Sequence, residues 1–510
     1  MKKILYIPLD ERPCNYLFPQ HLVNTRNDVQ LIVPPQEILG NKKKPAVVEK
    51  LWQFVFEHIG KTNGAVISAE MLIYGGLLPS RLHHLPDGAI EKRIENFRQL
   101  RKYNINTPIY VSNLIMRTPK VSTSDEEPDY YEYFGLELFR RAYLTDKKKR
   151  TGLRKDEESE LRQANDKIPQ CYIDDYEYRR EVNVKVNVRL LELIAEETID
   201  FLSIPQDDSS VYGYTARDQA IVYGNIATKR LQSKVMVYPG ADEVGCTLIA
   251  RMLNKLLDRK PSVFCFYSST IGPNIVPLYE DRPMNESVKS HILASGSTVT
   301  AIPNEADFIL AINAPGKVME EAANQKNKDV TYNSYRQLSF FLEQIQRWLQ
   351  LGKQVVLADN AFANGGDLEI IQYLDDYKVL DQLISYKGWN TNCNTLGTSI
   401  AAGIFGFGKQ NKLEIQRNLL YHIFDDAFYQ AQIRKEITDE LLPSLGGNYF
   451  DLNKQDHIVE REIQKQVLEK YQATVQQSFR HTIISKIKIY SPWSRMFEIG
   501  MNLELTHIQE

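Results

Sequence analysis

Short apolar runs rich in β-branched residues alternate along the chain with longer segments in which apolar residues recur at helical spacing. Eight runs have the length and composition of buried strands: 3–12, 64–72, 108–117, 200–208, 234–243, 262–270, 307–315 and 354–362. The segments between them, such as 46–59, are long enough to form helices that cross back over a sheet. Strands that alternate with helices predict βαβ units and a parallel sheet.

The number of these repeats favours one closed fold. Eight strand–helix repeats predict a (β/α)8 barrel with insertions, because such barrels extend from ~200 to more than 400 residues. Two further segments, 28–35 and 381–390, also have the pattern of strands, and a simple barrel does not use them. Two doubly wound α/β domains in series are therefore the alternative.

The domain boundaries follow from changes in this rhythm. Residues 1–408 are expected to form the α/β catalytic domain, with a helical insertion at about 120–199 that resembles a lid. From residue 409 to residue 510 the pattern changes to long helical segments and then to an alternating run, KIKIYSPWSRMFEIGMNLEL. We expect a C-terminal subdomain of helices and antiparallel strands there.

Charge and composition narrow the class of protein. The chain has 62 basic and 65 acidic side chains, so it has no general attraction for nucleic acid or an anionic membrane. No apolar run approaches the ~20 residues of a membrane span, and acidic residues follow the N-terminal run too early for a signal peptide. Five scattered cysteines without a C-x-x-C pair indicate neither a disulfide framework nor a zinc ribbon. We expect a cytoplasmic protein.

Polar residues gather where the predicted strands end, which is where parallel α/β folds bind ligands. They are Asp10, Glu11 and Arg12 after the first run, Glu70 and then Arg81 after the second, Asn113 and Arg117 after the third, Gln206, Asp207 and Asp208 after the fourth, Asp242 and Glu243 after the fifth, Asn313 after the seventh, and Asp359 and Asn360 after the eighth. This set predicts a polar, acidic pocket for a polyhydroxylated substrate. The three arginines either hold an acidic group of the substrate or, as we favour, neutralise the carboxylates of the pocket.

Two of these sites hold adjacent carboxylates, Asp207–Asp208 and Asp242–Glu243. Two carboxylates in one pocket push their pKa values apart, so that one is protonated and the other ionised. Glycoside hydrolysis requires this division between an acid and an ionised partner. The structural alternative is that the aspartates cap the helix beginning near Thr215 and that Glu243 lies in the first turn of its own helix.

Two short motifs carry a resemblance to known glycosidases. GADEVG, at 240–245, resembles the strand-end segment of family 20 β-N-acetylhexosaminidases, and QDD, at 206–208, resembles the adjacent aspartates of family 84 enzymes. In those families one carboxylate orients the 2-acetamido group of the substrate and its neighbour is the general acid. The resemblance implies either Asp207 as the orienting residue and Asp208 as the acid, or Asp242 and Glu243 in these roles.

Over its whole length the chain resembles the uncharacterised bacterial domain-of-unknown-function family 4127. The motifs that carry this resemblance are PLDERPCN, SAEMLIYGGLLPSR, QDDSSVYGY, YPGADEVG, ADNAFANGGD, GWNTNCNTLGT and SPWSRMFEIG. The resemblance implies no established activity.

The motif GWNTNCNTLGT adds Trp389 and Asn390 to the candidate site. An indole ring is a good platform for the face of a sugar, and amides are natural partners of hydroxyl groups. The alternative is that Trp389 packs in the core while the polar residues cap the following helix.

Three hypotheses of function follow. The first is a glycoside hydrolase that needs no cofactor and takes its carboxylate pair from Asp207, Asp208, Asp242 and Glu243, with an N-acetylhexosaminide as one candidate substrate. The second is a hydrolase or isomerase that holds Mg²⁺ or Mn²⁺ through Asp10, Asp207, Asp242 and Asp359. The third is a sugar-binding protein without catalytic activity.

Overall fold

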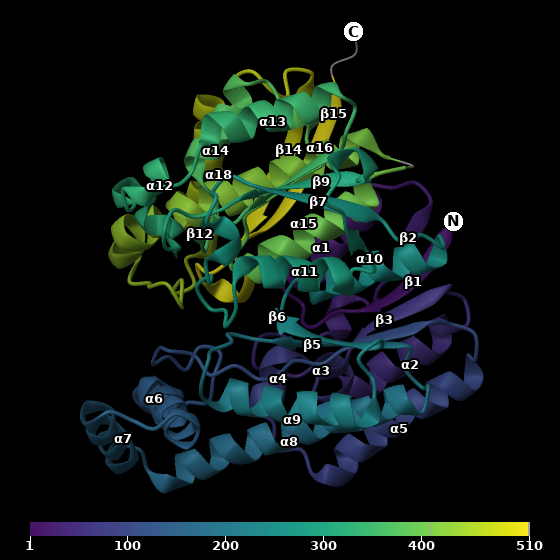
Figure 1. The fold of residues 1–510 in the computed structure, drawn as a ribbon, viewed down its shortest axis with the longest axis vertical. Coiled ribbons are helices and arrows are strands. Elements are labelled where there is room, and N and C mark those ends of the chain that lie inside the picture. Colours follow the sequence, from purple (N-terminus) through teal and green to yellow (C-terminus); the bar gives the residue numbers. More distant parts are fainter. Residues whose placement is uncertain (409, 508–510) are drawn as a thin grey trace.

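The computed structural model describes residues 1–408 and 410–507, and two parallel β-sheets dominate it (Figure 1). The first sheet has the order β2-β1-β3-β4-β5-β6 and is built from β1 (Lys2–Ile7), β2 (Val29–Ile32), β3 (Gly64–Ser68), β4 (Ile109–Ser112), β5 (Phe201–Gln206) and β6 (Val235–Pro239). The second has the order β13-β11-β9-β7-β8 and is built from β7 (Ser262–Tyr267), β8 (Thr298–Val299), β9 (Phe308–Asn313), β11 (Val355–Asp359) and β13 (Ser385–Lys387). Both sheets are therefore open, with free edge strands.

The same strand order occurs in both sheets. Counted from its own first strand, each sheet begins 2-1-3-4-5, the order of doubly wound α/β folds, and the first sheet adds a sixth strand. The direction of winding reverses between β1 and β3 and again between β7 and β9. The chain thus contains two α/β units in series, and the prediction of a (β/α)8 barrel is wrong. The segments 28–35 and 381–390, which a barrel left unused, supply β2 and β13.

Helices cover both faces of each sheet, which explains the nearly continuous apolar strands. The outer face of the first sheet carries α2 (Val48–Ile59), α5 (Asp87–Tyr103), α8 (Gln170–Ala195) and α9 (Tyr214–Lys229). In α2 the buried residues Val48, Leu51, Trp52, Val55 and Ile59 recur at helical spacing and form one apolar stripe.

A shared layer of helices joins the two units (Figure 1). It contains α1 (Pro13–Asn24), α10 (Val244–Leu256), α11 (Met284–Ala294) and α15 (Asn392–Gly406). Every residue of α15 is buried, which explains its small, uncharged sequence. The far face of the second sheet is covered by α13 (Leu338–Gln350) and α14 (Leu368–Asp376).

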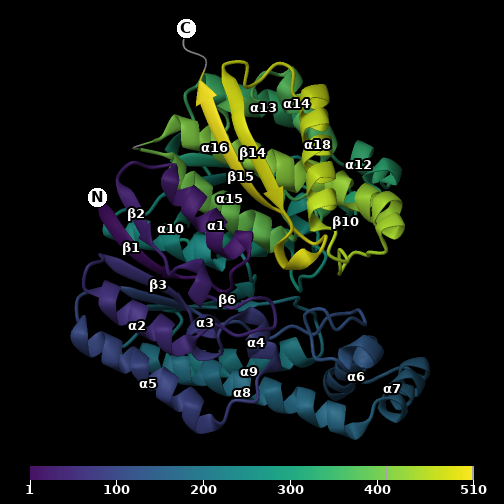
Figure 2. The same cartoon turned by 180° about the vertical axis from the view of Figure 1, so that it is seen from behind.

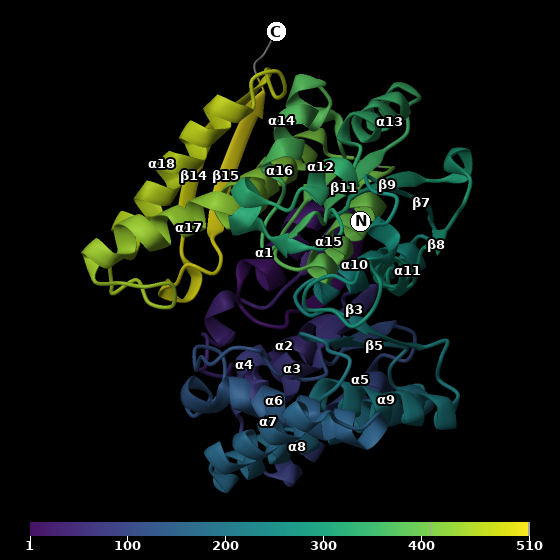
Figure 3. The ribbon, with the colours of Figure 1, turned by 60° about the vertical axis from the view of Figure 1, so that its left-hand side comes forward.

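The remaining segments extend these units. The region 120–199 contains α6 (Tyr131–Arg150), α7 (Lys155–Lys167) and α8, so the predicted insertion is helical, and α6 and α7 project from the first unit. Toward the C-terminus lie α16 (Lys412–His422), a π-helical segment (Ile423–Ile433), α18 (Asp456–Thr474) and the antiparallel pair β14 (Thr482–Tyr490) and β15 (Gly500–His507). These pack along the second unit (Figures 2 and 3). Residue 409, the predicted start of this subdomain, lies outside the described residues.

Several shorter elements and 3-10 turns lie between these. They include α3 (Ala69–Ile73), α4 (Leu77–Leu82), α12 (Thr331–Ser334), α17 (Arg434–Glu436) and the two-stranded parallel pair β10 (Glu320–Glu321) and β12 (Phe362–Ala363). None of the helices within the described residues combines the length and the apolar composition needed to cross a membrane.

Candidate functional site

A cavity of about 190 Å³ lies at the carboxyl ends of strands from both units. The first unit contributes Arg12, Arg81, Arg117, Glu126, Gln206, Asp207, Asp208 and Asp242 to its lining; the second contributes Tyr279, Asn364, Asn390, Thr391, Cys393 and Asn394; and Phe497 comes from the C-terminal segment. This is the edge at which doubly wound sheets bind ligands. Part of the polar set predicted at the strand ends lines this cavity.

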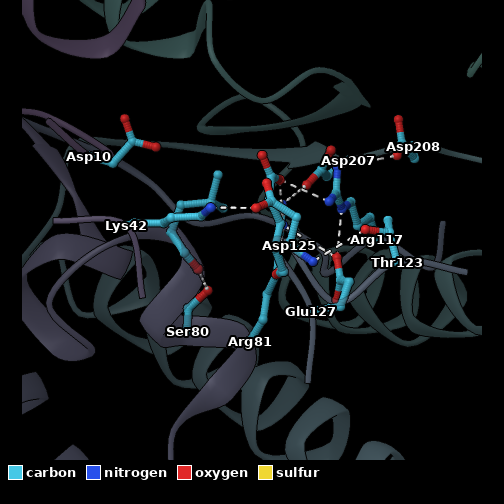
Figure 4. A network of polar contacts seen from close by, with 12 residues as sticks. Asp10, Lys42, Ser80, Arg81, Arg117, Thr123, Asp125, Glu127, Asp207 and Asp208 are labelled. Carbon is cyan, nitrogen blue, oxygen red and sulfur yellow. Dashed lines mark hydrogen bonds and ion pairs between the residues drawn. The ribbon is translucent and has the colours of Figure 1, made fainter. Parts of the chain in front are cut away.

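Arg81 and Arg117 are held among carboxylates on one side of this cavity (Figure 4). The Nη2 atom of Arg81 lies 2.7 Å from Oδ2 of Asp207, and its Nη1 atom lies 3.2 Å from Glu126 and 3.3 Å from Glu127. Arg117 contacts the same two glutamates, each at 2.8 Å. Both arginines thus neutralise carboxylates of the protein, which is the interpretation that we favoured from the sequence.

Arg12 joins the ends of β1 and β6 in the same manner. Its Nη2 atom lies 2.7 Å from Oδ2 of Asp10 and 2.6 Å from Oδ1 of Asp242, and Asn15 donates to both aspartates at 2.9 Å. Asp242 lines the cavity, whereas Asp10 does not. Burial raises the pKa of Asp242 and the Arg12 guanidinium opposes this rise. Asp10 is therefore a support for Arg12.

Asp208 differs from its neighbour Asp207 in exposure and in charge compensation. Its side chain is 28% exposed and its closest cation, Nη1 of Arg117, is 3.7 Å away, whereas Asp207 is 11% exposed and bound tightly to Arg81. Burial and the negative charge of Asp207 raise the pKa of Asp208 to about 6, against the opposing charges of Arg117 and Arg81. Asp208 also has a φ of +44°, a strained conformation often found at functional sites.

Glu243, the other candidate acid, lies outside this cavity. It is completely buried, accepts a hydrogen bond from the backbone nitrogen of Ala241 at 2.9 Å, and lies 3.3 Å from Nε2 of His291. A Cβ atom on Gly397 would be only 2.1 Å from Cγ of Glu243, so the glycine of α15 makes room for this side chain. Glu243 therefore connects β6 with the shared helical layer.

The other strand-end residues of the first unit form supporting contacts. Glu70 is buried and accepts from Nδ2 of Asn113 at 2.8 Å and from the backbone of Leu114. Glu11 accepts from Nε1 of Trp493 at 2.7 Å. None of these lines the cavity, whereas Gln206 does and accepts from Nη2 of Arg282 at 2.5 Å.

The predicted residues of the second unit gather in a separate buried cluster. Asn313 donates to Oδ1 of Asp359 at 2.9 Å, and Tyr386 donates to Oδ2 of the same carboxylate at 2.8 Å. Burial and the nearby Asp367 raise the pKa of Asp359 to about 7. Asn360 donates to the side chain of Asn392 at 2.6 Å. Asn313, Asp359 and Asn360 do not line the cavity.

Trp389 and Asn390 are adjacent but have different surroundings. The Trp389 ring is 2% exposed and makes edge contacts with Phe18 and Phe497, so it packs in the core and cannot stack on a substrate. Asn390 lines the cavity with a φ of +59°. Of the two, only Asn390 remains a candidate contact for a ligand.

Several site residues were not predicted from the sequence. The acidic run SDEEP in the insertion supplies Glu126 and Glu127, and the C-terminal motif SPWSRMFEIG supplies Arg495. The Nη1 atom of Arg495 lies 2.6 Å from Asp125 and 2.7 Å from Glu126. Tyr279 and Asn364 also line the cavity. The signal in the sequence was the run of three acidic residues in SDEEP and the arginine and glutamate of the C-terminal motif.

The described residues, 1–408 and 410–507, contain no group of three or more histidine, cysteine, aspartate or glutamate side chains arranged to hold a metal ion. Among the four proposed aspartate ligands, Asp10 and Asp242 bind Arg12, Asp207 binds Arg81, and Asp359 belongs to the cluster of the second unit. The four carboxylates therefore do not form one centre.

The fold and the cavity define a protein of two doubly wound α/β units with a polar, carboxylate-rich site between their strand ends. The chain belongs to the family described as "Protein of unknown function (DUF4127)", whose model matches residues 4–502. This confirms the family resemblance drawn from the motifs. A comparison with curated proteins finds no match.

Proposed function

We propose that the protein is a glycoside hydrolase in which Asp208 is the general acid and Asp242 is the ionised carboxylate that acts at the anomeric carbon. Burial and the neighbouring carboxylate of Asp207, which Arg81 holds in place, raise the pKa of Asp208 and so favour its protonated form. Arg12 and Asn15 hold Asp242 in position and oppose the rise in its pKa that burial causes.

The observation that carries this proposal is the unequal environment of two adjacent carboxylates in the cavity. Asp208 has a pKa of about 6 and an accessible side chain, while Asp207 is neutralised by a buried arginine. A general acid works best when its pKa lies near the working pH. In glycosidases the general acid is likewise a carboxyl group whose surroundings raise its pKa.

The rest of the cavity suits a sugar. Its volume of about 190 Å³ is below the ~300–1,000 Å³ of pockets for drug-sized ligands, which favours a group of monosaccharide size. The amides of Gln206, Asn364, Asn390 and Asn394 can donate and accept hydrogen bonds from hydroxyl groups. Tyr279 adds an aromatic ring at the lining.

A panel of aryl glycosides, including N-acetylhexosaminides, tests the proposal. We expect turnover by the wild-type protein and a loss of about 10²–10⁴-fold in kcat in Asp208→Asn, the range for removal of a general acid. Asp129→Asn is the matched control, because that side chain is fully exposed and 3.6 Å from Lys43. Equal turnover by Asp208→Asn and the control would contradict the proposal.

A further inference from the structure

A second cavity, of about 480 Å³, lies at the opposite edge of the first sheet. Tyr110, Phe201 and Met236, each at the amino end of its strand, form part of its lining. Side chains of α10, the turn before β7 and the end of α11 complete it. The candidate functional site is at the carboxyl ends of the same strands, so the two cavities are separate.

The lining of this second cavity is strongly basic. It contains Arg251, Lys255, Arg259 and Lys260 and no aspartate or glutamate. None of these four cations forms an ion pair with any carboxylate among residues 1–408 and 410–507. In contrast, the arginines of the first cavity, Arg12, Arg81 and Arg117, are all paired with carboxylates. The second cavity is thus a local concentration of uncompensated positive charge in a chain of net charge -3.

The two half-buried arginines are fixed in place by neutral partners. Arg251 donates to the carbonyl oxygens of Leu293 and Ala294 at the end of α11, and its guanidinium lies 3.6 Å from the ring centre of Phe201. Arg259 donates to Oδ1 of Asn254 at 3.0 Å and to the carbonyl oxygen of Ile404 in α15 at 2.8 Å. Each helix end carries only about half a negative charge, so these contacts leave most of the positive charge uncompensated.

Two carboxylates, Asp28 and Asp307, are close enough to act on the charge of Arg259, and both have other partners. Asp28 is bound by Arg26 at 2.8 Å, and Asp307 accepts from the backbone nitrogen of Ser262 at 2.7 Å. Burial and the nearby Arg26 together lower the pKa of Arg259 to about 10. A bound anion would relieve this repulsion, which gives the ligand a source of binding free energy.

We propose that this cavity binds a small molecule that carries two or more phosphate groups. The contacts above use Nη1 of Arg251 and Nε and Nη2 of Arg259, which leaves Nη2 of Arg251 and Nη1 of Arg259 to donate to phosphate oxygens. The exposed Lys255 and Lys260 add mobile charges. A volume of about 480 Å³ is within the ~300–1,000 Å³ of pockets for small ligands. The site is independent of the function proposed for the first cavity.

Calorimetric titration of the full-length protein with inorganic pyrophosphate, in a buffer without phosphate, tests this site. We expect saturable binding at one site that weakens as the salt concentration rises. Arg251→Gln and Arg259→Gln should each weaken binding by about tenfold or more, because each removes a charge-assisted hydrogen bond to phosphate. The double variant Lys255→Gln/Lys260→Gln, which changes only exposed side chains, should weaken binding without altering the fold.

Two control variants separate this site from other cations of the protein. Arg98→Gln removes a surface arginine that is paired with Glu95 and Glu196, and Arg117→Gln removes an arginine of the first cavity. Both should bind pyrophosphate as the wild type does. Absence of saturable binding, or binding that Arg117→Gln abolishes and the Lys255→Gln/Lys260→Gln variant retains, would overturn the proposal.

Discussion

Arg81 donates a hydrogen bond from Nη2 to Oδ2 of Asp207 at 2.7 Å, with the two side chains 2% and 11% exposed. Arg81 therefore pairs closely with Asp207, whereas the cation nearest Asp208, Nη1 of Arg117, lies 3.7 Å away. Adjacent carboxylates of the same chemical type therefore have different environments. Burial and the neighbouring charge of Asp207 raise the pKa of Asp208 to about 6, and its more distant guanidinium opposes this rise.

Replacement of Arg81 by methionine should destabilise the protein. The change leaves Asp207 without its cation and removes one partner of the completely buried Glu127. Breaking a buried ion pair from one side costs about 3–5 kcal/mol. Urea-induced unfolding of Arg81→Met should show a loss of this size. Arg98→Met, which breaks exposed ion pairs, should lose less than about 1 kcal/mol. Equal losses would contradict the role of Arg81.

Asp208→Asn should stabilise the protein at neutral pH. The pKa of Asp208 rises from 3.8 to about 6 on folding, so between these values the folded state binds more protons and stability falls as pH rises. An amide of the same shape does not carry this penalty. Thermal unfolding should show a higher midpoint for Asp208→Asn than for the wild type at pH 7.5, and the difference should shrink at pH 4. A lower midpoint at pH 7.5 would show that the ionised form is favoured by its surroundings.

The pH dependence of hydrolysis should follow the same group. A general acid acts in its protonated form, so kcat/KM should fall as pH rises above about 6, the pKa of Asp208. Asp207→Asn should shift this fall in kcat/KM to lower pH, because the variant lacks the negative charge that helps to raise the pKa of Asp208. A descending limb that stays in place in Asp207→Asn would exclude Asp208 as the titrating group.

Glu243→Gln should reduce stability more than catalysis. Glu243 is completely buried and has contacts with Ala241 and His291 away from the cavity. We expect a loss of about 1–3 kcal/mol in unfolding free energy, the cost of an imperfectly satisfied buried polar group. The turnover of the folded variant should stay within a few-fold of the wild type. A loss of turnover as large as that of Asp208→Asn would restore Glu243 as the candidate acid.

Local pattern was sufficient to predict the strands. All eight principal runs, together with 28–35 and 381–390, contain strands, because each is an apolar run that can be buried on both faces. Strand order is not a local property. It depends on how α10 and α15 pack between the sheets, and no periodicity along the chain encodes that contact. The barrel prediction failed for this reason, although the two additional strand-like runs already favoured two open sheets.

The candidate site was predictable only in part, for related reasons. Some residues that come shortly after a strand, such as Arg12 and Asp208, line the cavity. Glu243 and Trp389 follow strands too, but His291 and Phe18, from distant helices, hold them in the interior. Arg495 is 369 residues from Glu126, so no spacing along the chain could place the two side chains together.

The most direct measurement is the dependence of kcat/KM on the leaving group in the wild type and in Asp208→Asn. If Asp208 protonates the departing oxygen, Asp208→Asn should lose about 10²–10⁴-fold on glycosides with a poor leaving group and retain near wild-type rates on dinitrophenyl glycosides, which need no proton. An equal loss on both substrates, or no loss on either, would contradict the assignment of Asp208 as the general acid.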